Sequence, residues 1–163
     1  MTQEIFPTIL AVIALSATAP LAQTVTTDSF DVRITIVAEC EITSTETLDF
    51  GTQGVLGTDV DATATMEVTC TDTTPYDIGL NEGLGAGTTT SVRQMTSGGE
   101  TIAYALFQDA GRVTNWGNAV GADTQPATGT GDAQSFTVFG RVLAQATPAP
   151  GTYTDTVTVT VTY

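Results

Sequence analysis

The chain has 163 residues, 41% of them hydrophobic, which is enough for one globular domain with a buried core. It has 18 acidic residues against four arginines, with neither lysine nor histidine, and so a net charge of −14. Such a surface repels phosphate groups, so we expect no binding to nucleic acid and no docking on anionic membranes.

The first 22 residues have features of an export signal. An apolar run at residues 5–15 is too short to span a bilayer, and a segment rich in small residues follows it. Ala22 is the expected last residue before cleavage. The first residues carry no Lys or Arg, unlike an ordinary signal, and a buried core helix is the alternative. We therefore expect a signal peptide at residues 1–22, and no stable membrane insertion of the mature chain.

From residue 30 onward, hydrophobic residues alternate with polar ones, most often threonine. The clearest segments are residues 30–36, 62–70 and 156–163. This alternation predicts strands with one buried face and one wet face, as in antiparallel sheets. Shorter strands are expected at residues 48–50, 76–81, 91–95, 101–108 and 135–144. Segments rich in Gly, Thr and Asp separate them, and residues 117–132 are expected to form a long surface loop. The pattern predicts an all-β sandwich or barrel.

Two cysteines, Cys40 and Cys70, stand at the ends of alternating segments. A cysteine pair in an exported chain predicts one disulfide. The alternatives are a reactive thiol or half of a metal site, but histidine is absent and the spacing fits no zinc motif. A bridge that closes a loop of this length stabilises the fold by about 3–4 kcal/mol.

The two ends of the mature chain both alternate strongly. The apolar positions at the C-terminal end are Val157, Val159, Val161 and Tyr163. A sandwich that finishes on such a strand has an open edge, which invites pairing with another strand. The apolar segment near the N-terminus is the expected cover, either by folding back or by crossing to another copy of the chain.

Few residues are suited to catalysis or metal binding. Without histidine and lysine, the commonest general bases and Schiff-base nucleophiles are absent, so we expect neither enzymatic activity nor a cofactor. The glycine-rich run at residues 83–87 lacks the lysine of a phosphate-binding loop and is expected to be a turn. Asp59 and Asp61, or Asp109, offer oxygen ligands for Ca²⁺; solvated acids are the simpler interpretation, and no metal site is predicted.

Short motifs throughout the mature chain resemble those of one known family. They are Cys40, LDFG at 48–51, the strand at 66–70, PYDIGLNEG at 75–83, RQM at 93–95, IAYALFQD at 102–109, WG at 116–117, FGRV at 139–142 and GTYTD at 151–155. Each motif alone is weak, but their order and spacing together are specific. The chain resembles the spore coat protein U domain, which is shared by pilins of the archaic chaperone–usher pathway.

The resemblance implies an incomplete immunoglobulin-like β-sandwich that lacks its final strand and is completed by a donor strand from a neighbouring subunit. A periplasmic chaperone first supplies the missing strand. An outer-membrane usher then exchanges it for the N-terminal segment of the next subunit. The resemblance therefore implies a homopolymer, exported through the periplasm to the cell surface as an extracellular pilus that serves adhesion and biofilm formation.

The donor segment is expected at residues 23–37, ahead of a pilin domain at residues 38–163. Strand addition places alternate side chains in pockets along an acceptor edge, here the edge that begins at Val157. The side chains expected to enter these pockets are Phe30, Val32, Ile34 and Ile36. The alternatives are that residues 30–36 form the first strand of the chain's own domain, or that the inserted segment begins earlier, with Val25.

Two other functions are compatible with the sequence. One is a secreted coat or matrix protein, as the family name implies. The other is a carbohydrate-binding adhesin module, in which Trp116 and Tyr104 stack on a ligand. As residues of the family motifs, both aromatic side chains are instead expected in the core.

Overall fold

The computed structural model describes residues 22–163 of the chain. The predicted signal peptide therefore lies, except for Ala22, outside the described residues. The chain divides into two units, residues 1–34 and residues 35–163. In the first unit, residues 22–34 are exposed and belong to no strand. The eight strands described below all belong to the second unit.

The second unit is built from strands and connecting loops. In chain order the strands are β1 (Cys40–Thr45), β2 (Val60–Cys70), β3 (Pro75–Leu80), β4 (Arg93–Ser97), β5 (Glu100–Phe107), β6 (Gln125–Thr128), β7 (Ala133–Val142) and β8 (Val159–Thr162). Among residues 22–163 there is no helix of the length and hydrophobicity that a bilayer span requires.

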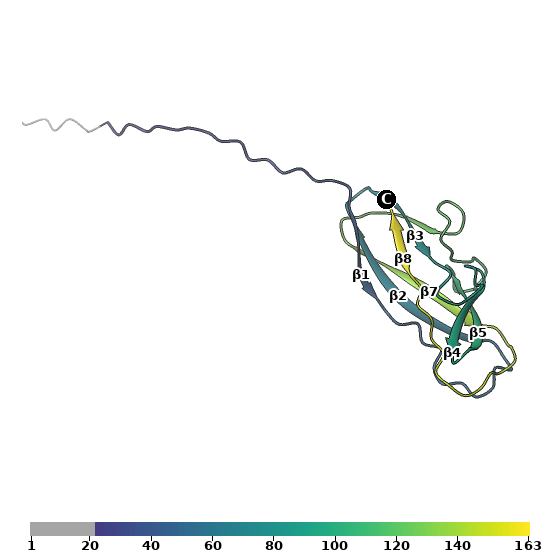
Figure 1. The fold of residues 1–163 in the computed structure, drawn as a ribbon. Coiled ribbons are helices and arrows are strands. Elements are labelled where there is room, and N and C mark those ends of the chain that lie inside the picture. Colours follow the sequence, from purple (N-terminus) through teal and green to yellow (C-terminus); the bar gives the residue numbers. More distant parts are fainter. Residues whose placement is uncertain (1–21) are drawn as a thin grey trace, which may run out of the picture. The chain divides into compact units, whose positions relative to one another are not determined.

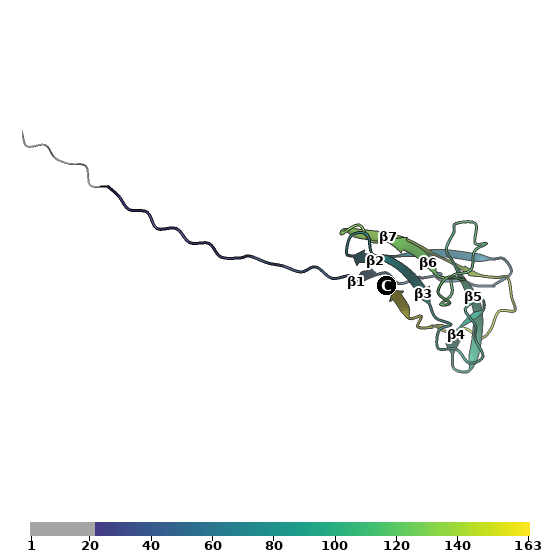
Figure 2. The same ribbon diagram turned by 90° about the horizontal axis from the view of Figure 1, so that it is seen from above.

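The strands form two antiparallel sheets. Five strands have the order β1-β2-β7-β5-β4, and three have the order β6-β3-β8. In Figure 1, β1, β2 and β7 run side by side, while β8, in yellow, lies next to β3; Figure 2 shows the same strands from above. Buried residues of both sheets belong to one hydrophobic cluster, so the sheets pack face to face. The predicted all-β sandwich is confirmed.

Strand β2 shows how the alternating sequence produces this packing. Ala64, Met66, Val68 and Cys70 are all buried, whereas the threonine and glutamate side chains between them lie on the outer face. β-branched threonine favours extended backbone and tolerates water, so the same segment serves a wet and a dry face. The strand lies between β1 and β7 in the sheet, which leaves neither of its edges free.

A buried arginine closes one side of the core. The Arg93 side chain, at the start of β4, is fully buried. Its guanidinium donates to four carbonyl oxygens at 2.6–2.9 Å, those of Leu80, Asn81, Thr90 and Trp116. Burial lowers the pKa of the Arg93 guanidinium. The four carbonyls offset this cost because they occupy most of its five N–H donors, so the cation joins β3 and β4 to the loop that holds Trp116.

The indole of Trp116 lies in the core and donates to the Ile78 carbonyl at 2.9 Å. Tyr104 is also buried. Their expected place in the core is therefore confirmed.

Several predicted element boundaries were wrong. Residues 48–50 form no strand; this segment crosses over β7 at Gly140, where an added Cβ would lie 2.9 Å from Leu48 and 3.0 Å from Phe50. The predicted loop at residues 117–132 contains β6. Strand β1 was not predicted as such. Residues 30–36 pair with no strand of the described chain, so the alternative that they form the first strand of the chain's own domain is wrong.

Candidate functional site: an open groove between β1 and β8

The sandwich is open along one side. Two cavities of about 500 and 760 Å³ share part of their lining, including Leu48, Phe50 and Met95. One wall extends from Thr45, the last residue of β1, to Phe50, and the other is the segment of residues 152–157 that leads toward β8. We call this continuous depression the groove. Its floor is the hydrophobic core, and it contains the side chains of Ala64, Met66, Leu80, Tyr104, Leu106 and Val138.

On the β8 side, apolar side chains face the core without being covered. Val159 lies opposite Leu80 and Val161 lies opposite Ile78 in the β3–β8 pair. Paired residues of antiparallel strands project to the same face, so both valines face the interior. The β3 partners are 0–2% exposed, whereas Val157, Val159 and Val161 are only half-buried, although all three pack against the core.

The main chain of β8 is also unpaired on this side. The Thr158 carbonyl accepts from the Asn81 N–H at 3.1 Å, so the main chain of Thr158 points toward β3. Main-chain groups of successive residues in a strand point to opposite edges. Those of Val159 and Val161 therefore point away from β3, toward the groove, and β8 is the last strand of its sheet.

On the opposite side, β1 shows the same combination. Ile42 lies opposite Val68, which is 0% exposed, and so faces the interior, yet Ile42 itself is 37% exposed. The Glu39 carbonyl accepts from the Thr71 N–H at 2.9 Å, which places the main-chain groups of Cys40 and Ile42 on the edge away from β2. β8 thus offers a hydrogen-bonding edge and uncovered apolar side chains at the groove, and β1 offers the same combination beyond the groove's lining.

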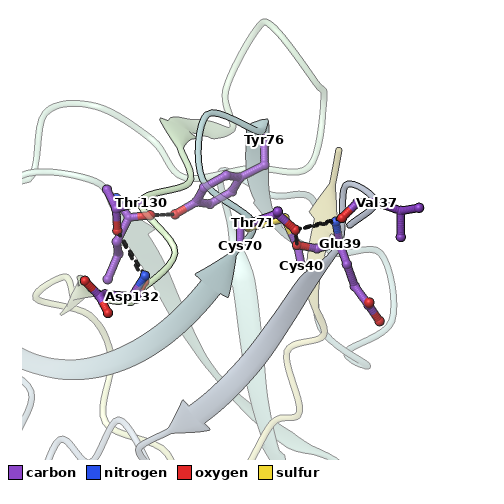
Figure 3. Close-up of a disulfide and its surroundings, with 9 residues drawn as sticks. Val37, Glu39, Cys40, Cys70, Thr71, Tyr76, Thr130 and Asp132 are labelled. Atoms are coloured by element: carbon purple, nitrogen blue, oxygen red, sulfur yellow. Dashed lines mark hydrogen bonds between the residues drawn. A yellow bond between two sulfur atoms is a disulfide. The ribbon is translucent and has the colours of Figure 1, made fainter. Parts of the chain in front are cut away.

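The start of β1 is fixed to β2 by the predicted disulfide. Cys40 and Cys70 are joined and lie directly opposite each other in the β1–β2 register, which confirms the pairing. Figure 3 shows the hydroxyl of Thr71 beside the bridge. This hydroxyl accepts from the Glu39 N–H at 3.0 Å and lies 3.1 Å from the Val37 carbonyl, to which it donates. The segment that precedes β1 is therefore bound to the turn after β2.

The other wall of the groove is held by Asp155. Its Oδ2 accepts from the hydroxyl of Tyr104 at 2.6 Å, and its Oδ1 accepts from the N–H groups of Leu84 and Thr156 at 2.8 Å each. Burial, together with this bond to the carboxylate, raises the pKa of the Tyr104 hydroxyl. The phenol therefore stays a neutral donor, and the wall of the groove is ordered before anything occupies it.

The residues predicted for the acceptor edge occupy different places. Val157 and Val159 line the groove. Val161 packs against the core beyond the cavity lining, and Tyr163, which follows β8, is 59% exposed. Sequence reasoning missed the β1 side and Asp155. Burial at Tyr104 was expected, but nothing in the sequence pointed to its bond with a carboxylate 51 positions away.

The residues predicted for the donor segment are exposed in the single chain. The exposed fractions are 87% for Phe30, 85% for Val32, 83% for Ile34 and 69% for Ile36. Four large apolar side chains at alternating positions are seldom left uncovered in a soluble protein. The segment therefore has the pattern of a strand without a partner.

The acids considered for Ca²⁺ have other partners. Asp61 accepts two bonds from Arg141, at 2.7 and 2.8 Å, and lies 3.2 Å from Arg112. The hydrogen bond from Arg141, more than any other cause, holds the pKa of the Asp61 carboxyl below its usual value. Asp59 accepts from the Ala144 N–H, and Asp109 from those of Val113 and Thr114. Within residues 22–163, no three acidic or cysteine side chains gather as metal ligands would.

Comparisons with family models, with other proteins and with solved structures each found similarity to this chain. The family model described as the Spore Coat Protein U domain matches residues 26–160. The chain is 32% identical to Protein U of Myxococcus xanthus, over 95% of this chain and 94% of that protein. A chain in the crystal structure of the CsuC–CsuE chaperone–tip adhesion subunit pre-assembly complex, from archaic chaperone–usher Csu pili of Acinetobacter baumannii, matches with a TM-score of 0.58 and 29% identity.

That structural match covers 79% of the present chain but 40% of the matched one, so the chain spans less than half of that relative. Together with the two packed sheets, it identifies the sandwich as immunoglobulin-like.

Proposed function

Because the chain belongs to the Spore Coat Protein U domain family, we propose that it is a structural subunit of a chaperone–usher pilus. In this proposal the groove between β1 and β8 receives the N-terminal segment of a second copy. The segment comprises residues 23–37, and the pilin domain comprises residues 38–163. Residues 1–22 are proposed to act as the export signal that is removed first.

One observation carries the proposal. Two interior-facing residues stay exposed to solvent beside unpaired strand edges, Val159 of β8 in the lining of the groove and Ile42 of β1 beyond that lining. An added strand bonds to the main chain of both edges and places alternate side chains over the core. Phe30, Val32 and Ile34 supply those side chains at the right spacing, and Ile36 extends the series.

Burial of the donor side chains and ordering of the donor segment make opposing contributions to the free energy of such an exchange. Full burial of four large apolar side chains is worth about 6–12 kcal/mol. Ordering the segment costs about 1–2 kcal/mol per residue, so burial alone does not guarantee high affinity. A strand that completes a core leaves only when that core opens, so slow unfolding gives the contact its durability.

The geometry of the contact produces a filament. The donor segment and the groove are different parts of the chain, so each copy gives one and receives one. A contact of this heterologous kind does not close on itself unless the rotation between copies happens to form a ring. We therefore propose a homopolymer at the cell surface, assembled with a periplasmic chaperone and an outer-membrane usher, and serving adhesion and biofilm formation.

Replacement of a donor side chain tests the proposal. The substitution Ile34→Asp should abolish fibres, because a carboxylate would have to enter the apolar groove without a partner. Electron microscopy of material sheared from cells that express the chain provides the measurement. The isolated variant should keep the melting temperature of the wild-type domain, since Ile34 is 83% exposed.

The matched control is Thr35→Asp at the neighbouring position, whose side chain would face solvent in the inserted strand. It should leave fibres intact. Normal fibres from Ile34→Asp, or from a chain that lacks residues 23–36, would show that another segment is the donor.

A coat or matrix component is the second candidate, because the family description names a spore coat. Immunogold labelling separates the two functions. Label along thin fibres supports the pilus, whereas label spread over a spore or cell surface without fibres supports the coat.

A further inference from the structure

The four arginines differ in how they are used. Arg93 is buried among carbonyl groups, and both Arg112 and Arg141 lie against Asp61. Arg33 is exposed and forms no ion pair among residues 22–163. In a chain with a net charge of −14, it is the one arginine that the fold leaves without a defined role.

The position of Arg33 in the proposed donor segment determines where it points. It stands between Val32 and Ile34, whose side chains enter the groove in the proposed function. Successive side chains of a strand point to opposite faces. Arg33 therefore projects from the outer surface of the completed sandwich. There it lies beside the outward-facing side chains of β1 and β8.

Those two strands present different chemistry on their outer faces. On β8 the outward residues are threonines, at positions 160 and 162, and Thr158 lies just before the strand. On β1, Cys40 and Ile42 face the interior, so Glu41 faces outward, opposite Thr69 of β2. Glu39 lies two residues earlier and is exposed as well. We call Glu39 and Glu41 the acidic margin.

We propose that Arg33 of one subunit pairs with the acidic margin of the next, in particular with Glu41. The proposal rests on the proposed function. Directly opposed residues on neighbouring strands have Cβ atoms about 4.5–5.5 Å apart, and diagonal neighbours are about 7–8 Å apart. The long side chain of Arg33 reaches either distance. The ion pair favours registers that place Arg33 beside β1, and it gives two repelling subunits one local attraction.

Charge reversal in the full-length chain tests this pairing. Fibres of Arg33→Glu, Glu41→Arg and the double variant are sheared from cells, and release of monomers in urea is followed over time. At low salt, the Arg33→Glu fibres should release subunits about fivefold faster than wild type, and high salt should reduce that difference. The double variant should return to within about twofold of wild type, because the pair is restored with its signs exchanged.

The matched control combines Arg33→Glu with Glu100→Arg, at an exposed residue that begins β5 and lies outside the acidic margin. It changes the net charge as Glu41→Arg does, but it should not restore stability. Equal rescue by Glu41→Arg and Glu100→Arg would overturn the pairing, as would wild-type release rates for Arg33→Glu. If Arg33→Glu gives no fibres, recovery of fibres in the double variant supports the pairing, and its failure overturns it. Absence of fibres from the wild-type chain would contradict the proposed function itself.

Discussion

The strands β3 and β8 pair residue by residue, yet one belongs to the closed part of the sandwich and the other to its open side. Ile78 and Leu80 are 0–2% exposed, while their partners Val161 and Val159 are half-buried. Both strands are apolar on the inward face, so composition does not cause the difference. The open side has the residues of a core and lacks a neighbouring strand, and for this reason we propose an added strand as its occupant.

The largest expected effect contrasts the two partners in one cross-strand pair. Leu80→Ala should lower the free energy of unfolding of the monomer by about 3–5 kcal/mol, because it leaves a cavity in a closed core. Val159→Ala should cost only about 1 kcal/mol, since its side chain already contacts solvent. Urea unfolding of the isolated chain, in the Ile34→Asp background that keeps it monomeric, provides both values.

In fibres the costs of Leu80→Ala and Val159→Ala should be more nearly equal, because the proposed inserted strand covers Val159. Val159→Ala should then accelerate subunit release, whereas the same substitution at an exposed loop residue, Val113→Ala, should not. If Leu80→Ala and Val159→Ala cost the same in the monomer, the distinction between a closed and an open side would be wrong.

Removal of the disulfide should give the next largest loss of stability, and it compares β1, on the open side, with β7 in the closed part. Replacing Cys40 and Cys70 together by alanine should cost about 3–4 kcal/mol, because the unfolded chain regains the freedom that the bridge removes. Locally, amide hydrogens of β1 should exchange faster while those of β7 change little, since β1 is nearly all exposed. Hydrogen exchange by mass spectrometry measures this difference, and equal acceleration in both strands would contradict it.

The smallest expected loss of stability comes from the ion pair of Asp61, on the outer surface of the closed part. The pKa of Asp61 is lowered in the folded chain, chiefly by the hydrogen bond from Arg141. Its contribution to stability is therefore present above its unfolded pKa and is lost as the pH falls through the folded value. Because the side chain is 39% exposed, Asp61→Asn should cost less than about 1 kcal/mol at pH 7 and nothing at strongly acidic pH.

Urea unfolding at both pH values checks this, with Asp72→Asn as the control at an exposed carboxylate outside the ion pairs of the described chain. A cost that does not change with pH would show that Asp61 acts through packing. It would also leave no electrostatic contribution from this ion pair to the stability of the closed part.

Strands could be located from the sequence where the alternating residues are also the buried ones. In β2 and β7 each inward residue meets the core, so period-two patterning located the strands. The pattern is weak in β1, whose sequence CEITST is mostly polar and exposed. β6 escaped because Pro126 and the surrounding Gly and Thr residues are typical of loops; proline is tolerated there because β6 lies at a sheet edge.

Only half of the groove was predictable. The alternating spacing of the valines near the C-terminus predicted the β8 side of the groove. The other side depends on Ile42, whose orientation follows from the register with Val68, and on Asp155, whose bond to Tyr104 joins distant positions. Such information arises from tertiary contacts, which a single sequence does not display.

The bridge at the first residue of β1 also determines how the domain responds to pulling. A six-residue edge strand that is drawn from its end separates one hydrogen-bonded pair after another, at low force. Because Cys40 is covalently joined to Cys70, a pull on the preceding segment passes to β2, which is paired on both edges and buried on one face. Where that segment links one subunit to the next, β2 therefore carries the tension, and β1 is not pulled away from the edge of the sheet.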